Sequence, residues 1–186
     1  MNTIRWIFLA LLLGPALAFA NTPGAEPPLG GDFTLRTPAG KPVSLSSLKG
    51  KVVLLYFGFT YCPEMCPTEL LQFQNLLKRL PANKRARVQP VFVSVDPGRD
   101  TPDVLAPYIA HFGGGILALT GEEAELRQVA AQYGATFRYV PTGSSYTVDH
   151  TVNTYVIDPT GKLTRVFMYG SSTKDMADYV LSLLQD

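Results

Sequence analysis

Apolar and polar residues follow one another along this chain in blocks typical of strands and helices. A run rich in β-branched and aromatic residues, Val52 to Phe57, has the length and composition of a buried central strand. After a short turn, leucine and phenylalanine recur at helical spacing from Leu70 to Leu80, which predicts an amphipathic helix. Similar patterns predict a strand over 88–95, a helix over 101–112, a strand over 116–119, a helix over 120–134, a β-hairpin over 153–169 and a helix over 173–184.

Two further segments complete the predicted domain. Residues 33–45 alternate around a Pro-Ala-Gly turn, which predicts an N-terminal β-hairpin. Residues 135–147 carry alternating aromatic side chains and a Pro-Thr-Gly turn, which indicates an excursion that leads back to the sheet. Strands that alternate with helices predict a layered α/β domain with parallel strand pairs, closed by an antiparallel hairpin.

The first residues are typical of a targeting segment. Arg5 precedes an apolar stretch over 7–13, and Ala18-Phe19-Ala20 is a small-x-small cleavage signal. The apolar stretch is shorter than the roughly 20 residues that span a membrane, which favours a cleaved signal peptide over a tether to the inner membrane. For an exported, periplasmic protein we expect a signal peptide over 1–20, a flexible linker over 21–31 and one domain over 32–186.

Charge and cysteine content narrow the possible functions. The 16 basic and 15 acidic side chains nearly balance, so no basic surface for nucleic acid is predicted. Exported domains often carry structural disulfides, yet this chain has two cysteines, Cys62 and Cys66, close together on one turn. The pair is therefore not placed for general stapling of the fold.

The two cysteines lie between the central strand and the first helix, and each is followed by proline. Proline disfavours helical backbone in the residue before it, so we expect Cys66 to be the helix cap and Pro67 the first helical residue. Glu69 would then lie in the first turn, where a carboxylate suits the positive helix end. Both sulfurs would be near a helix N-terminus, where thiolate is favoured over thiol. A simple stabilising disulfide is the alternative, although it would close only a small loop.

Two histidines are candidates for a third functional group. His111 is expected as a partly exposed helix residue without a task. His150 lies in a polar segment directly before the strand that begins at 153. Asp96 follows the predicted strand over 88–95, and ligand sites in α/β sheets lie at the carboxyl ends of parallel strands. Two thiolates and one imidazole form a soft ligand set suited to Cu(I), whereas a structural zinc ion would require four protein ligands.

Four motifs, in order and at family-like spacing, resemble those of the Sco (SenC) family. They are GFTYCPEMCP (58–67), VDPGRDTP (95–102), VDHT (148–151) and YVIDPTG (155–161). The resemblance extends from about Phe33 to the C-terminus. It implies an α/β, thioredoxin-like three-layer sandwich with an N-terminal β-hairpin and an inserted excursion before the last β-hairpin.

The resemblance also implies a function. Copper, as Cu(I) and with Cu(II) left open, would be held by Cys62, Cys66 and His150. The family serves maturation of the dinuclear copper (CuA) centre of cytochrome c oxidase, as a copper donor, as a reductant of that centre's cysteines, or as both. Implied partners are cytochrome c oxidase subunit II or another copper protein, with a thioredoxin-like reductant and a periplasmic copper donor as further candidates. Asp96 and Asp100 match the family's aspartate-rich loop near the metal, but a turn residue and a helix-start residue explain them equally well.

Two enzyme classes are the alternatives to a metallochaperone. In a general thiol–disulfide oxidoreductase, Cys62 and Cys66 would be the redox-active pair, one attacking and the other resolving the mixed disulfide. Thioredoxins have two residues between the cysteines and a proline just before the strand that here begins at Asn153, whereas this chain has three residues and no such proline. A peroxidase of peroxiredoxin type would have threonine at the position of Phe59. Metal delivery is therefore favoured.

Overall fold

The computed structural model describes residues 29–113 and 115–184. The expected signal peptide and most of the expected linker lie outside these residues. None of the helices among these residues has the length and apolar composition of a membrane span.

A five-stranded mixed sheet forms the centre of the molecule, in the order β5-β4-β3-β8-β9. Its middle strand β3 (Val52–Gly58) is buried over its whole length, as its uninterrupted apolar sequence requires. β4 (Val88–Ser94) pairs parallel with β3, and β5 (Leu117–Leu119) pairs parallel with β4. β8 (Thr154–Ile157) and β9 (Leu163–Phe167) extend the sheet as an antiparallel hairpin. The carboxyl ends of β3 and β4 therefore meet at one end of the sheet, where loops can build a site.

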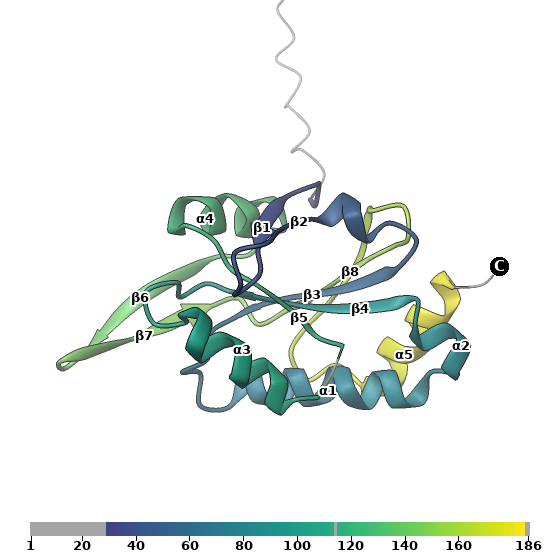
Figure 1. Cartoon of the computed structure of the whole chain (residues 1–186). Helices are drawn as coiled ribbons and strands as arrows, with labels where there is room; N and C mark the ends of the chain where they lie inside the picture. Colours follow the sequence, from purple (N-terminus) through teal and green to yellow (C-terminus); the bar gives the residue numbers. More distant parts are fainter. Residues whose placement is uncertain (1–28, 114, 185–186) are drawn as a thin grey trace, which may run out of the picture.

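Helices cover both faces of this sheet (Figure 1). α1 (Met65–Arg79), α3 (Pro102–His111) and α5 (Thr173–Leu183) lie on one face, and α1 contacts α5. α4 (Glu123–Gln132) lies on the other face, and the short α2 (Ala82–Arg85) leads from α1 towards β4. The helices turn apolar stripes to the sheet, with buried residues that include Leu70, Phe73 and Leu76 of α1 and Leu126, Val129 and Ala130 of α4.

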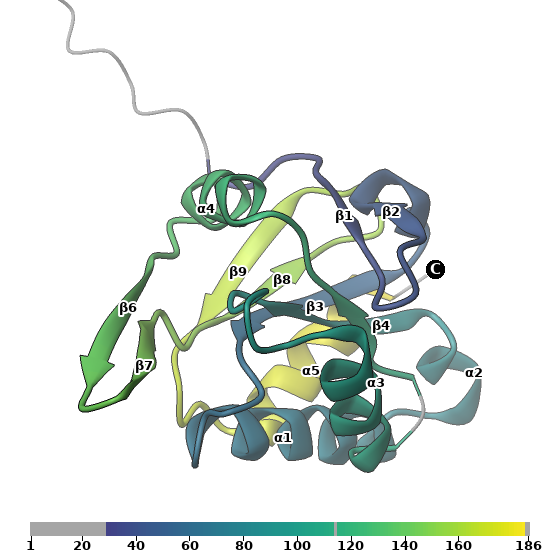
Figure 2. The ribbon, with the colours of Figure 1, turned by 60° about the vertical axis from the view of Figure 1, so that its left-hand side comes forward.

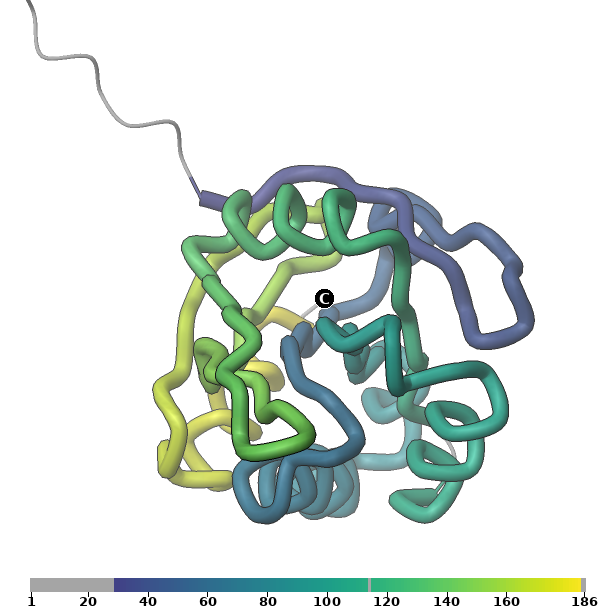
Figure 3. The backbone as a smooth tube through the Cα atoms, turned by 90° about the vertical axis from the view of Figure 1, so that its left-hand side faces the viewer, coloured from purple at the N-terminus to yellow at the C-terminus, as the bar shows by residue number. Residues whose placement is uncertain are grey.

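Two small hairpins accompany the central sheet. β1 (Thr34–Arg36) pairs with β2 (Pro42–Ser44), and the 3-10 helix η1 (Leu45–Leu48) leads from them towards β3. β6 (Phe137–Thr142) and β7 (Ser145–His150) form an antiparallel sheet of their own. This β6–β7 hairpin projects from the body of the molecule (Figure 2). It lies nearest the viewer when the left-hand side of Figure 1 is turned to the front (Figure 3).

The predicted architecture is confirmed. The sheet with helices on both faces is the expected three-layer α/β sandwich, and the N-terminal hairpin lies where the sequence predicted it. The expected excursion over 135–147 is the β6–β7 hairpin, which continues three residues further than predicted. His150 is therefore the last residue of a strand, paired with Phe137, and not a residue of a loop.

Candidate metal centre

Three side chains that could hold a metal ion converge near the end of β3. Sγ of Cys62, Sγ of Cys66 and a ring nitrogen of His150 lie within 4.8 Å of one another. No fourth histidine, cysteine or carboxylate joins this group among the residues that the structure describes. His111 is exposed at the end of α3, away from the group, as the sequence predicted. The structure thus brings together the three residues that the motifs singled out.

The loop that carries Cys62 is fixed by hydrogen bonds on its N-terminal side. The backbone N–H of Cys62 donates to the carbonyl oxygen of Phe59 at 3.3 Å. Thr60 donates to the Asp100 carboxylate twice, from its backbone N–H at 3.0 Å and from its hydroxyl at 2.6 Å. Since Asp100 is itself buried, this loop has a rigid anchor two residues before the first cysteine.

The start of α1 differs from the prediction. The helix begins at Met65 with Glu64 as its cap, so Cys66 is already helical and Pro67 is the third helical residue. Proline is tolerated there because the first N–H groups of a helix have no intrahelical partner to lose. The bias of the residue before proline towards extended backbone is overridden at Cys66, whose side chain is fully buried in the core. The backbone N–H of Cys66 points to Sγ of Cys62 at 3.4 Å, which stabilises a thiolate at that sulfur.

His150 presents one ring nitrogen to the cysteines. Its Nδ1 lies 3.1 Å from the carbonyl oxygen of Thr151, and its Nε2 lies 3.6 Å from Sγ of Cys66. A carbonyl oxygen can only accept a hydrogen bond, so Nδ1 carries the proton and the lone pair is on Nε2. This tautomer is the one that can ligate a metal through Nε2. The ring is held edge-on by Phe59, with centroids 5.6 Å apart, and by Tyr56, at 6.1 Å.

The two thiols are electrostatically unequal. The hydrogen bond from the Cys66 thiol, helped by the backbone N–H groups of Cys66 and Glu64, holds the pKa of Cys62 well below its ordinary value, although burial opposes this. The same pairing, together with burial, raises the pKa of Cys66. Cys62 is 5% exposed and Cys66 fully buried. These shifts favour the thiolate at the more accessible Cys62 and the protonated thiol at Cys66.

Sequence reasoning missed the roles of two polar residues beneath the site, Tyr56 and Glu69. The Tyr56 hydroxyl on β3 donates to Sγ of Cys66 at 3.7 Å, and burial beside this thiol raises the pKa of Tyr56. Glu69 was expected in the first turn of α1 at the helix end, but it is the fifth helical residue, is buried, and accepts a hydrogen bond from the Thr154 hydroxyl. Burial raises the pKa of its carboxyl. The sequence offered one signal for such a contact, which is the polar hydroxyl of Tyr56 inside an otherwise apolar strand.

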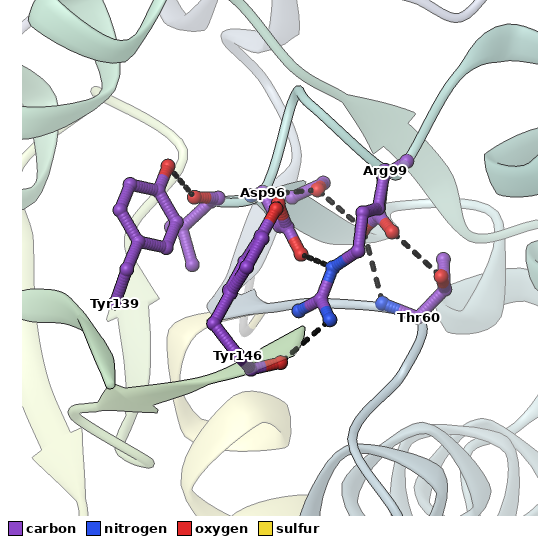
Figure 4. Close-up of polar contacts among 8 residues, drawn as sticks. Thr60, Asp96, Arg99, Tyr139 and Tyr146 are labelled. Carbon is purple, nitrogen blue, oxygen red and sulfur yellow. Dashed lines mark hydrogen bonds and ion pairs between the residues drawn. The ribbon is translucent and has the colours of Figure 1, made fainter. Parts of the chain in front are cut away.

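The two aspartates of the 95–102 motif bind protein groups, and neither is in the metal-ligating group. Asp96 accepts hydrogen bonds from Nε of Arg99 at 2.6 Å and from the Tyr146 hydroxyl at 2.7 Å (Figure 4). Asp100 accepts from the Ser94 hydroxyl at 2.5 Å in addition to Thr60. Both carboxylates are buried and satisfied, so they join the loops around the site rather than pointing into it.

Comparison with known sequences identifies relatives in yeast and bacteria. The SCO1/SenC family model matches residues 21–185. The mitochondrial protein SCO2 of Saccharomyces cerevisiae is 40% identical over 148 residues, which are 78% of this chain and 49% of the relative. The SCO2-like protein RC0895 of Rickettsia conorii is 36% identical over 155 residues, which are 82% of this chain and 75% of the relative. The chain thus spans about half the length of the mitochondrial relative.

Solved structures share the fold. The crystal structure of Arabidopsis thaliana ScoI with copper bound has a TM-score of 0.77 and 33% sequence identity, over 84% of this chain and 98% of that one. A structure of BsSco, described as a member of the Sco family of cytochrome c oxidase assembly proteins with a disulfide switch, has a TM-score of 0.68 and 30% identity, over 84% and 95% of the two chains. These likenesses confirm the thioredoxin-like sandwich that the motifs implied.

Proposed function

The chain belongs to the SCO1/SenC family, and we propose that it is an exported copper-binding protein that delivers Cu(I) to the CuA centre of cytochrome c oxidase. One observation carries the proposal: Sγ of Cys62, Sγ of Cys66 and a ring nitrogen of His150 lie within 4.8 Å of one another. The relatives add support, because one solved structure is described with copper bound and another as a cytochrome c oxidase assembly protein.

The donor set suits Cu(I) better than the common alternatives. Thiolate sulfur is a soft ligand that favours Cu(I), and a low-coordinate cuprous ion is satisfied by two sulfurs and one imidazole. A structural zinc site would use four protein ligands, and the described residues offer three. Burial of both cysteines also keeps bulk water from the sulfurs, which protects the bound ion and its ligands from oxidation.

Delivery requires that a partner's ligands reach the ion. Tyr61 directly precedes Cys62 and Met65 directly precedes Cys66, and they are 58% and 39% exposed, so the site lies just beneath the surface. A cysteine or histidine of subunit II, or of another copper protein, could therefore displace Cys62 first, while Cys66 and His150 still hold the ion. Stepwise exchange of ligands moves copper without releasing it to solvent.

Copper loading depends on the redox state of the pair. No disulfide joins Cys62 and Cys66 in this structure. A disulfide between them would have no thiolates to offer, so the oxidised protein must be reduced before it binds Cu(I), and a thioredoxin-like protein could supply those electrons. A periplasmic copper donor would then load the reduced pair.

The inequality of the two thiols favours a second candidate function, reduction of the CuA cysteines. The Cys62 thiolate would attack a disulfide of subunit II and form a mixed disulfide, releasing one partner thiolate. Cys66 would then lose its proton and attack Cys62, which releases the second partner thiolate. In this exchange the partner disulfide is reduced and the Cys62–Cys66 pair is oxidised.

Anaerobic titration of the reduced protein with Cu(I), against a competing chelator, tests the binding site. We expect one tightly held ion, and binding that is much weaker in His150→Ala and Cys66→Ala. His111→Ala is the matched control, because it removes the other histidine of the chain and should bind as the wild type does. Binding that does not require His150 would contradict the three-ligand site.

A second assay separates delivery from reduction. Copper-loaded protein is mixed with a metal-free soluble fragment of subunit II in its dithiol form, and copper-free reduced protein is mixed with the same fragment in its disulfide form. Delivery predicts transfer in the first mixture that is lost in His150→Ala. Reduction predicts partner thiols in the second mixture, with His150→Ala still active and Cys62→Ala inactive.

Export is part of the same proposal and rests on residues 1–20, which lie outside the described residues. Sequencing the N-terminus of the protein from a periplasmic fraction tests it. Cleavage after Ala20 is the expected result, and an intact N-terminus in the membrane fraction would show a tether instead.

A further inference from the structure

The hairpin that carries His150 is separate from the strand that leads to the cysteines. β6 and β7 pair with each other, and in the described part of the chain they pair with no strand of the central sheet. Cys66, by contrast, lies in the first turn of α1, directly after the loop from the central strand. The 3.6 Å approach of His150 Nε2 to Cys66 Sγ therefore depends on how the hairpin is held at the end of the sheet. Part of that hold is the short link over 151–153 to β8, which pairs with β3, and the burial of Phe137 and Val148.

The segment 95–99 adds polar contacts to the hairpin, made by the side chains of Asp96 and Arg99 and by the carbonyl oxygen of Val95 (Figure 4). Nη1 of Arg99 donates to the carbonyl oxygen of Tyr146 at 2.7 Å, and the Tyr146 hydroxyl donates to Oδ1 of Asp96 at 2.7 Å. The Tyr139 hydroxyl donates to the carbonyl oxygen of Val95 at 3.1 Å. Both strands of the hairpin are thus tied to the loop that follows β4.

Arg99 also contacts the cysteine loop. The central carbon of its guanidinium lies 3.8 Å from the centroid of the Tyr146 ring, 4.9 Å from that of Tyr61 and 5.9 Å from that of Phe59. Phe59 in turn packs edge-on against the ring of His150. The guanidinium thus lies between the loop that bears Cys62 and the hairpin that bears His150, and it contacts both.

We propose that Arg99 is a positioning residue of the metal centre, which clamps the β6–β7 hairpin to the cysteine loop and so holds His150 Nε2 at the sulfurs. Its importance for copper rests on the proposed function, whereas its hold on His150 does not. Asp96 orients the guanidinium through the ion pair at 2.6 Å, with the carboxylate side chain 1% exposed and that of Arg99 19% exposed.

The chemistry of the contacts explains why this residue is arginine. A planar guanidinium can donate to Asp96, donate to the Tyr146 carbonyl in another direction and stack on aromatic rings at the same time, which an ammonium group cannot do. Nη2 of Arg99 is buried and makes no hydrogen bond with the described residues.

A test without metal uses the chain's two histidines as probe and reference. Carbethoxylation by diethyl pyrocarbonate, mapped by mass spectrometry in the reduced, copper-free protein, should modify exposed His111 quickly and half-buried His150 slowly. We expect Arg99→Met to speed modification of His150 about tenfold relative to His111, which corresponds to a tenfold larger population of the displaced hairpin. Arg165→Met is the matched control, because Arg165 stacks on Phe167 at 4.7 Å and on Tyr179 at 4.9 Å, away from the hairpin.

The copper test is a double-mutant cycle with His150. If Arg99 acts by holding His150 in place, the apparent Cu(I) affinity falls in proportion to the fraction of molecules in which His150 lies at the sulfurs. A variant Arg99→Met in which this fraction is about a tenth should bind Cu(I) about tenfold more weakly. The same substitution in the His150→Ala background should then have no further effect. A general loss of structure would weaken Cu(I) binding in both backgrounds.

Arg99→Met leaves the buried Asp96 carboxylate without its ion-pair partner, which destabilises the fold, so a second variant is needed. Tyr146→Leu is the second variant, since it removes the ring from a half-buried hairpin position and keeps the Asp96–Arg99 pair. Faster modification of His150, in either variant, with His111 unchanged supports the proposal. Unchanged modification of His150 in both variants, or an equal loss of Cu(I) affinity in both backgrounds, overturns it. Faster modification in a protein whose wild type binds no copper would leave the clamp standing and refute the proposed function alone.

Discussion

At the scale of single residues, the metal centre depends on glycine at position 58, where a larger residue would leave no room for Cys66. A Cβ atom on Gly58 would lie 2.8 Å from Sγ of Cys66 and 2.8 Å from Cε2 of Phe92. Real Cβ atoms essentially never come so close to another heavy atom. The last position of β3 must therefore be glycine for Cys66 to lie under the end of the sheet. The reason is space and not backbone conformation, because φ at Gly58 is not positive.

Gly58→Ala should for this reason affect both stability and copper binding. Overpacking of a core typically costs about 1–3 kcal/mol of unfolding free energy, and here the atom that must move is a proposed ligand. We expect a loss of this size in urea unfolding and weaker Cu(I) binding in a chelator competition. Gly98→Ala is the control, since its Cβ would meet the Tyr146 hydroxyl at an ordinary 3.5 Å. Equal behaviour of the two variants would contradict this role of Gly58.

At the scale of elements, hydrophobic periodicity predicted which segments are strands and helices, because burial determines both. The start of α1 was not predictable in the same way. Local rules placed the cap at Cys66, but tertiary packing of this side chain draws the helix back to Met65. The end of the β6–β7 hairpin was not predicted either, because the polar residues Asp149 and His150 still pair across the hairpin with Arg138 and Phe137.

The motifs did identify the three residues that converge at the site. They did not identify the contacts of Arg99 and Tyr56 around it, because these contacts form only in the folded arrangement.

The turn between β3 and α1 predicts an unusual titration of Cys62. The Cys66 thiol is the main group that lowers the pKa of Cys62. In the reduced, metal-free protein, alkylation of Cys62 should therefore proceed with a midpoint well below its ordinary pKa. In Cys66→Ala the midpoint should rise, because the thiol donor is gone while burial still favours the neutral form. The measurement is the alkylation rate against pH, with peptide mapping to separate the two sites, and the same midpoint in both proteins would count against this role of the Cys66 thiol.

At the scale of the whole molecule, the centre joins segments that are far apart in the sequence. Cys66 and His150 are separated by 84 positions, and they meet only when the hairpin is docked at the end of the sheet. The unfolded chain keeps its two cysteines close together but cannot add the histidine. An ion held by all three residues therefore binds the folded state more tightly than the unfolded one.

Copper should accordingly raise the melting temperature. At a free Cu(I) concentration a thousand times the Kd, one-site linkage gives about 4 kcal/mol of stabilisation, less any binding to the unfolded cysteines. For a domain of this size, each kcal/mol corresponds to about 2–4 °C in Tm. Anaerobic calorimetry of the reduced protein with and without Cu(I) should show an increase of about 8–16 °C, and a smaller one in His150→Ala. Identical melting temperatures with and without copper would mean that the ion does not discriminate between the folded and unfolded states.

The central claim is that Cys62, Cys66 and His150 together ligate one Cu(I) ion, and X-ray absorption at the copper edge tests it most directly. For the reduced protein loaded with one equivalent, we predict a three-coordinate ion with two sulfur neighbours and one imidazole nitrogen, and loss of the imidazole scattering in His150→Ala. Two sulfurs without imidazole in the wild type, or an unchanged spectrum in His150→Ala, would contradict the three-ligand centre.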